Sequence, residues 1–306
     1  MNQRLKHAAE LAALASGVPA ICRRLKRRRS LVLAYHNVVP AGVRPRGDLS
    51  LHLTQKAFSE QLDCLLTLCE VVPLTSLIDG TPARARRPRV AITFDDAYLG
   101  AVTAGLDELT RRDMPFTIFV APGLLGQEPW WDTAAEAMDG AIPHNVRSEW
   151  LQRLAGDGSA ILREVPAGHF RDVANQPSVG SKISSPELLK EMTTRRGASV
   201  ASHAWTHRNL AALAEEGVRA ELVRSIEWLS ARFSCFVPLL AYPYGLSSRM
   251  VEVVAAEVGY RAAFLVDGGW LPERPAMSPF TLPRMNVPAG LSLNGFRLRL
   301  SGIGTP

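Results

Sequence analysis

Short apolar runs alternate along the chain with longer stretches in which apolar residues recur every three or four positions. The first run, Leu31–Tyr35, is followed by a stretch in which Phe58, Leu62 and Leu65 lie at helical spacing. Strands that alternate with helices of this length are typical of parallel βαβ units. We therefore predict further strands at Arg89–Phe94, Phe116–Ala121, Ala198–Ser202, Pro238–Tyr242 and Ala262–Val266, and helices near Tyr98–Arg112, Pro186–Arg196, Glu215–Phe233 and Ser248–Val258.

The number of strands favours an α/β barrel over an open sheet. About seven strand-like runs are expected, and no GxGxxG motif follows the first, as a dinucleotide-binding sheet would require. The 306 residues, 47% hydrophobic and 21% charged, are sufficient for one such barrel with a sizeable core. We predict a barrel over residues 31–290, preceded by an arm of residues 1–30 and followed by a tail of residues 291–306.

The segment 123–185 is the least regular part of the predicted barrel. It contains the sequence PWWD at Pro129–Asp132 and a later stretch rich in Gly, Pro and Asn. Long ordered loops in compact domains are usually lids or binding elements. We expect this segment to be inserted over one face of the barrel as loops and short helices.

Basic charge is concentrated in the arm. Residues 1–30 hold eight basic side chains and one acid, Glu10, so their formal net charge is 8 − 1 = +7. The whole chain carries +6, so the net charge of the other 276 residues is 6 − 7 = −1. A protein that binds nucleic acid would spread positive charge over a face of its fold. We therefore expect no nucleic-acid partner. The basic residues of the arm are Arg4, Lys6, Arg23, Arg24, Lys26, Arg27, Arg28 and Arg29.

The apolar part of the arm differs from a signal peptide. His7–Ile21 is interrupted by Glu10, Gly17 and Pro19, and the strongest charge follows it instead of preceding it. It is also shorter than the ~20 apolar residues that span a bilayer. We expect a cytoplasmic protein whose arm forms a short amphipathic helix, placed either on the surface of the inner membrane or on the protein itself. A solvated tail, or a secreted or anchored form, is the alternative.

Four cysteines, at positions 22, 64, 69 and 235, form no CxxC pair. Cys64 and Cys69 lie in an apolar helical pattern, which is typical of reduced thiols in a core. The cysteines therefore require no oxidising compartment.

Two adjacent acids, Asp95 and Asp96, follow the strand Arg89–Phe94. Neighbouring carboxylates repel each other unless a cation, a shared proton or separate partners relieve the repulsion. The pair is also explained by a helix N-cap followed by a favourable acid in the first turn. The residues alone leave both interpretations open.

Two histidines, His203 and His207, follow the strand Ala198–Ser202 at a spacing of four. Neutral imidazoles are common metal ligands, and this spacing allows both rings to meet one ion. With one carboxylate they would complete a three-ligand site that leaves positions open for water and substrate, as catalytic metals require. A single histidine would instead be interpreted as structural.

A third polar segment, Leu240–Gly245, follows the next predicted strand. Pro243 restricts the backbone and Gly245 permits a sharp turn, so the peptide N–H of Tyr244 could act as an oxyanion donor at the barrel mouth. On its own the segment is equally consistent with a simple turn.

Together the motifs TFDD, SHxxxH and YPYG, in this order at successive strand ends, resemble the polysaccharide deacetylases of carbohydrate esterase family 4, the NodB-homology domain. The resemblance extends over roughly 31–287. It implies a distorted (β/α)7 barrel and metal-dependent removal of acetyl groups from an N-acetylated glycan. It also implies that Asp95 is the catalytic base and that Asp96, His203 and His207 bind one divalent ion, zinc before cobalt, nickel or iron.

The sequence LAYHNVVP, with His36, resembles the branch that contains biofilm poly-N-acetylglucosamine deacetylases. In that branch the general-acid histidine precedes the acid pair, and no LxH motif in the last third of this chain offers an alternative. A histidine that titrates near neutral pH suits proton donation to a leaving amine. A buried structural histidine is the competing interpretation.

The chain also departs from the family pattern. Ala241 stands where typical members have an arginine that orients the catalytic base, and Ala204 replaces the common Ser or Thr after the first metal histidine. We expect Arg284 to replace the missing arginine, with a plain surface residue as the alternative. Asp267 and Trp270 match the family's Asp-Trp motif only loosely.

Two other functions remain compatible with these residues. The same site could hydrolyse O-acetyl esters or amides that are not sugars, or the domain could be a catalytically silent glycan-binding module. Trp130 and Trp131 in the inserted segment would either stack on a sugar ring or pack in the protein.

Overall fold

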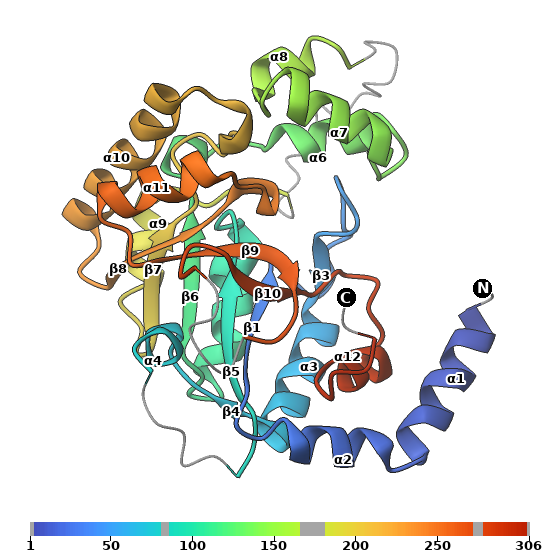
Figure 1. The fold of residues 1–306 in the computed structure, drawn as a ribbon. Helices are drawn as coiled ribbons and strands as arrows, with labels where there is room; N and C mark the ends of the chain where they lie inside the picture. Colours follow the sequence, from blue (N-terminus) through green and yellow to red (C-terminus); the bar gives the residue numbers. More distant parts are fainter. Residues whose placement is uncertain (1–2, 81–85, 166–180, 272–277, 305–306) are drawn as a thin grey trace.

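The computed structural model describes residues 3–80, 86–165, 181–271 and 278–304 (Figure 1). Within them, parallel strands pair in the order β1-β10-β9-β8-β7-β6-β5, and β1 also pairs with β5, so the sheet closes into a seven-stranded barrel. The predicted (β/α)7 barrel is therefore confirmed. Its strands are β1 (Ser30–Tyr35), β5 (Arg89–Phe94), β6 (Phe116–Val120), β7 (Ala198–Ser202), β8 (Phe236–Ala241), β9 (Ala262–Gly268) and β10 (Leu282–Asn286).

The barrel strands form where apolar residues are continuous. Every residue of β5 and β6 is buried, as expected for parallel strands covered on both faces. Register shifts between β7 and β8 and between β9 and β10 make the barrel irregular. No strand range was predicted for β10, although about seven strands were expected. Three short strands were also not predicted, β2 (Asn37–Val39), β3 (His52–Thr54) and β4 (Glu70–Val71), of which β4 extends the sheet beside β5.

Helices cover the outside of the barrel. The helix expected near 98–112 is divided into a π-helical segment, Ala101–Gly105, and α5 (Leu106–Thr110). A glycine at each end of the π segment, Gly100 and Gly105, leaves room for the close approach of Val38. The other covering helices are α3 (Gln55–Leu68), α4 (Leu74–Ile78), α9 (Pro186–Met192), α10 (Glu215–Arg232), α11 (Arg249–Val258) and α12 (Leu293–Arg299).

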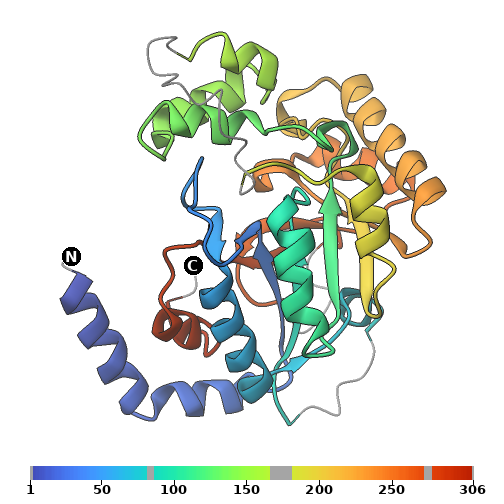
Figure 2. The same cartoon turned by 180° about the vertical axis from the view of Figure 1, so that it is seen from behind.

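The inserted segment forms a separate layer, which we call the cap. It contains α6 (Trp130–Glu136), α7 (His144–Arg153) and α8 (Gly158–Leu162), which lie together beyond one end of the barrel (Figures 1 and 2). The cap has its own small apolar core, formed by Trp130, Ala134, Ile142, Trp150, Leu151 and Ile161. Residues 166–180 of the predicted insertion lie outside the described residues.

The arm forms two helices, α1 (Gln3–Ala15) and α2 (Val18–Leu25). The carboxylate of Glu10 in α1 accepts a 2.6 Å hydrogen bond from Ser292 at the start of α12, and Arg23 in α2 donates to Ser301 at 3.0 Å. The residues beyond the predicted barrel are also structured, because Phe296 of α12 is fully buried in the main core. In the part of the chain that the structure describes, no helix is both long and apolar enough to cross a bilayer.

The cysteine side chains are free thiols. Burial raises the pKa of Cys64 to about 11 and that of Cys69 to about 12, so both remain protonated at neutral pH. This agrees with their interpretation as core thiols.

Candidate metal centre and catalytic groups

The sequence-predicted residues meet at the carboxyl ends of the barrel strands. Asp95 and Asp96 follow β5, His203 follows β7, and the turn Pro243–Gly245 follows β8. They line one cavity of about 590 Å³ between the barrel and the cap. This is the end of a parallel α/β barrel where loops bring side chains from several strands together. The cavity is lined from the barrel side by His36, Asp95, Asp96, His203, His207, Tyr242, Tyr244, Gly245 and Asn286, and from the cap by Trp131, Ile142, His144, Arg147 and Leu151.

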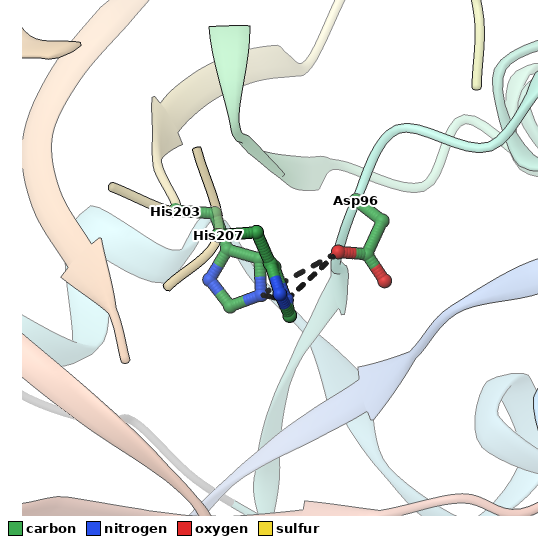
Figure 3. A group of neighbouring side chains, drawn as sticks. All are labelled: Asp96, His203 and His207. Atoms are coloured by element: carbon green, nitrogen blue, oxygen red, sulfur yellow. Dashed lines mark hydrogen bonds and ion pairs between the residues drawn. The ribbon is translucent and has the colours of Figure 1, made fainter. Parts of the chain in front are cut away.

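One carboxylate and two imidazoles converge inside this cavity (Figure 3). The Nε2 atom of His207 lies 3.2 Å from Oδ1 of Asp96, and that of His203 lies 3.7 Å from the same oxygen. The two Nε2 atoms are 3.1 Å apart. Among the described residues, these three form the group whose ligand atoms lie within 4.8 Å of one another.

The chemistry of the three groups suits a divalent cation. The Nδ1–H of His203 donates to the carbonyl of Ala241 at 2.7 Å, which leaves the lone pair on the Nε2 that faces the group. The Oδ1 atom of Asp96 is buried and accepts no hydrogen bond from a described residue. An uncompensated buried oxygen beside two imidazole nitrogens matches the ligand set of a zinc-like ion.

Burial also sets the protonation of the group. It lowers the pKa of His203 and lowers that of His207 to about 4, so both rings are neutral and able to bind a metal at neutral pH. Burial raises the pKa of Asp96 to about 6, against the opposing effect of His203. A cation at this position would favour the ionised carboxylate.

The loops that carry these groups contain left-handed backbone at residues other than glycine. The φ angles are 68° at Asp96, 60° at Ala97, 62° at Ala204, 57° at His207 and 60° at Tyr244. Such conformations cost energy and gather at functional sites, where the surrounding structure holds them. Asp96 is therefore not a simple helix N-cap, which would have extended backbone.

Arg284 lies behind the acid pair and is fully buried. Its two terminal nitrogens each donate a 2.7 Å hydrogen bond to one oxygen of Asp95, and its Nε donates to the carbonyl of Leu265 at 2.8 Å. Burial alone would raise the pKa of Asp95, but the charge and hydrogen bonds of Arg284 outweigh it and hold that pKa well below its usual range. The alternative of a plain surface arginine is wrong.

His36 follows β1 and faces the same acid. Its Nε2 lies 4.0 Å from Oδ2 of Asp95, and its side chain is 15% exposed. Burial lowers the pKa of His36, although Asp95 and Asp96 act in the opposite direction. Its protonated form is therefore a stronger acid than a free imidazolium.

The turn after β8 places Tyr244 against His207, the second histidine of the candidate metal-binding group. The ring centroids of Tyr244 and His207 are 4.6 Å apart at a nearly perpendicular angle. Within the turn, the N–H groups of Gly245 and Leu246 bond to the carbonyls of Tyr242 and Pro243, while no described residue accepts the N–H of Tyr244. This N–H remains available to a substrate oxygen.

A buried network of hydrogen bonds, which the sequence did not predict, contacts His207 through the ring of Trp131. The ring of Trp131 lies 4.5 Å from that of His207, and its Nε1 donates to the hydroxyl of Tyr98 at 2.7 Å. Tyr98 donates to Asp132 at 2.8 Å, and Asp132 also receives the Nε2–H of His52 at 3.0 Å. The network joins the cap to the barrel beside His207 of the candidate metal-binding group.

Glu221 of α10 is a second group that sequence reasoning missed. Its carboxylate accepts hydrogen bonds from the backbone N–H groups of Trp205 (2.9 Å) and Thr206 (2.8 Å) and from the Thr206 hydroxyl. It thereby fixes the short loop between His203 and His207. One acid among several on an amphipathic helix carries no sequence signal of this role.

Other residues considered from the sequence lie elsewhere. Asp267 is exposed near the end of β9, and Trp270 packs beneath Lys26, whose Nζ is 5.4 Å from its ring. Trp130 is buried in the cap core and donates to the Tyr244 hydroxyl at 3.2 Å. Of the two tryptophans considered for sugar stacking, Trp131 is the one that lines the cavity.

Comparison with known proteins is consistent with this arrangement. Three solved structures share the fold at low identity: the deacetylase PplD of Streptococcus pyogenes in complex with acetate (TM-score 0.62, 15% identity, covering 89% of this chain and 98% of that one), IcaB of Ammonifex degensii (0.62, 19%, 90% and 96%) and the BpsB deacetylase domain of Bordetella bronchiseptica (0.54, 17%, 85% and 96%). No curated protein matches the sequence. The family model described as polysaccharide deacetylase matches residues 83–263, more than half of the chain. The chain therefore belongs to the polysaccharide deacetylase family.

Proposed function

We propose that the protein is a metal-dependent hydrolase that removes N-acetyl groups from an N-acetylated glycan. The observation that carries the proposal is the position of Asp95. Arg284 keeps it ionised, and it is next in sequence to Asp96, whose Oδ1 meets His203 and His207. A general base beside a three-ligand group that can hold a metal ion is an arrangement suited to the hydrolysis of an unactivated amide.

The residues of the chain divide the reaction between them. When bound at Asp96, His203 and His207, a divalent ion supplies a Lewis acid that polarises an amide carbonyl and acidifies a water molecule. Asp95 accepts the proton of the attacking water, and the N–H of Tyr244, set by Pro243, donates to the oxygen that gains negative charge.

His36 completes the reaction by protonating the nitrogen of the leaving amino sugar. Amines are poor leaving groups unless they are protonated, so the acid is needed more for an amide than for an ester. The position of His36, directly after β1, supports a place in the branch with poly-N-acetylglucosamine deacetylases. Zinc suits two imidazoles and one carboxylate, and cobalt, nickel and iron accept the same ligands.

The test is acetate release from a panel of N-acetylated oligosaccharides by protein loaded in turn with each metal, with O-acetylated sugars and simple acetamides in parallel. We expect release from at least one N-acetylated saccharide, abolished by a chelator and restored by added metal. Release only from the O-acetyl or non-sugar substrates would identify the alternative hydrolases. Glycan binding without release from any substrate would identify a silent module.

A further inference from the structure

The arm exposes large apolar side chains at an unusual density. Within the described residues, ten large apolar side chains are exposed, and five of them lie in α1 and α2. Surface apolar residues that are scattered singly need no explanation, whereas a group of them marks an interaction site. The five are Leu5 (64% exposed), Leu11 (48%), Val18 (50%), Ile21 (62%) and Leu25 (77%).

In α2 the exposed apolar residues form a single face. Val18, Ile21 and Leu25 are spaced by three and four residues, which places them on one side of a helix. Pro19, by contrast, is buried, and Cys22 is half-buried. The helix therefore contacts the protein through one side and presents its larger apolar side chains to solvent.

The same arrangement continues in α1. Leu5, Ala8, Ala12 and Ala15 share one face by their spacing, and all four are exposed. By contrast, the charged residue Glu10 of the same helix is buried, and its carboxylate accepts the hydrogen bond from Ser292. A helix that packs only for its own stability would turn its apolar face inward.

Positive charge lies next to the apolar face of α2. Arg24, in the last turn of α2, and Arg27 and Arg28, which follow the helix, are exposed. Figures 1 and 2 show α1 and α2 at the outer edge of the molecule, with α2 beyond the barrel end opposite the cap. A surface that meets this side meets both the apolar face and the arginines.

We infer that α1 and α2 attach the protein to the surface of an anionic lipid bilayer. Clusters of basic residues are attracted to anionic lipids, and exposed leucine and isoleucine side chains add apolar area that enters the interface. A second copy of the chain would bring the same exposed arginines against each other, which opposes a symmetric dimer through this face. The inference is independent of the reaction at the barrel mouth.

Co-sedimentation of the full chain with vesicles tests the inference. We expect binding to mixed phosphatidylcholine and phosphatidylglycerol vesicles, weaker binding to pure phosphatidylcholine, and a decrease as salt rises. The variant Arg24→Glu/Arg28→Glu should reduce partitioning at least about tenfold, because each basic residue near the surface contributes about 1 kcal/mol. The variant Ile21→Ser/Leu25→Ser should reduce it on both kinds of vesicle.

Matched variants elsewhere on the surface control for charge and apolarity alone. Arg196→Glu/Arg249→Glu makes the same change in net charge at side chains that are 89% and 81% exposed. Leu66→Ser/Val253→Ser removes exposed apolar area outside the arm. Both controls should bind vesicles like the unchanged chain.

Three results would overturn the inference. In the first, the arm variants bind vesicles as well as the control variants do. In the second, the unchanged chain binds anionic and neutral vesicles equally. In the third, Ile21→Ser/Leu25→Ser dissociates an oligomer in sedimentation velocity without changing lipid binding, which would make the arm an interface between copies.

Discussion

The guanidinium of Arg284 donates two 2.7 Å hydrogen bonds to the carboxylate of Asp95, although 189 residues separate the two in sequence. The pair joins the last barrel strand, β10, to the end of β5. Ala241, the position at which the family pattern has an arginine, instead contributes its carbonyl to His203. The same electrostatic task is thus performed from a different strand, because a closed barrel brings the ends of all strands to one mouth.

Replacing Arg284 by Met should raise the pKa of Asp95. Burial raises that pKa and Arg284 lowers it, so without the guanidinium the effect of burial remains. The base is then protonated at higher pH, and the acidic limb of the rate profile should move to higher pH. Arg284→Lys, which keeps the charge but loses the two-pronged geometry, should shift it less. An unchanged acidic limb in Arg284→Met would contradict the assigned role.

The same substitution should lower stability at neutral pH. A carboxylate with a depressed folded-state pKa stabilises the fold above its unfolded pKa, and that contribution is lost as pH falls through the folded value. Arg284→Met removes the cause of the depression and leaves a buried charge unpaired, which costs about 3–5 kcal/mol. Urea unfolding of the unchanged chain and the variant at neutral pH, compared with unfolding in acid where the Asp95 of the variant is protonated, should show the difference in stability shrinking as pH falls.

Substitutions in the acid pair and the histidine pair should separate metal binding from catalysis. His207→Ala removes one of three ligand atoms, so both bound metal and activity should be lost. Asp95→Asn leaves the three ligands in place and removes the base, so metal should remain while turnover falls by about 10²–10⁴-fold. Metal content by mass spectrometry, measured beside acetate release, distinguishes the two. Full activity in metal-free protein would end this interpretation.

The sequence predicted the barrel because its strands are buried on both faces and are therefore apolar throughout. The strand β10 was not predicted by this criterion because Pro283 and Arg284 interrupt its apolar run. Residues that follow apolar strands were easy to identify, because strand ends mark the barrel mouth. Asp95, His203 and Tyr244 were found in this way.

Residues that support the site from a distance could not be predicted. Asp132 receives bonds from His52 and Tyr98, which come from separate elements, and nothing local marks it as part of a network. Glu221 contacts a loop 15 residues before it in sequence. In the sequence it is one of several acids on an amphipathic helix and cannot be distinguished from an acid on the surface. Such roles arise from tertiary contacts, which sequence periodicity does not encode.

Replacing Glu221 by Gln should weaken metal binding more than it weakens the fold. The amide oxygen of Gln can still accept both backbone N–H groups, which donate to the same carboxylate oxygen, but these bonds are no longer strengthened by charge. The amide nitrogen that replaces the other oxygen cannot accept the Thr206 hydroxyl. Changes to groups that orient metal ligands typically cost about 10–100-fold in affinity. Glu227→Gln, an exposed acid on the same helix, is the matched control and should bind metal normally. Equal metal dissociation constants in the two variants would refute the positioning role.

Replacing His36 by Gln should reduce turnover in a way that depends on the leaving group. The side chain is not one of the three ligand groups, so bound metal should be retained. For an N-acetylated saccharide the leaving amine needs a proton, and loss of the acid should cost about 10²–10⁴-fold. An activated ester such as 4-nitrophenyl acetate has a leaving group that is stable as an anion, so its hydrolysis should fall far less. Steady-state rates of both substrates with metal-loaded protein measure the difference. Equal losses on the two would show that His36 shapes the site without donating the proton.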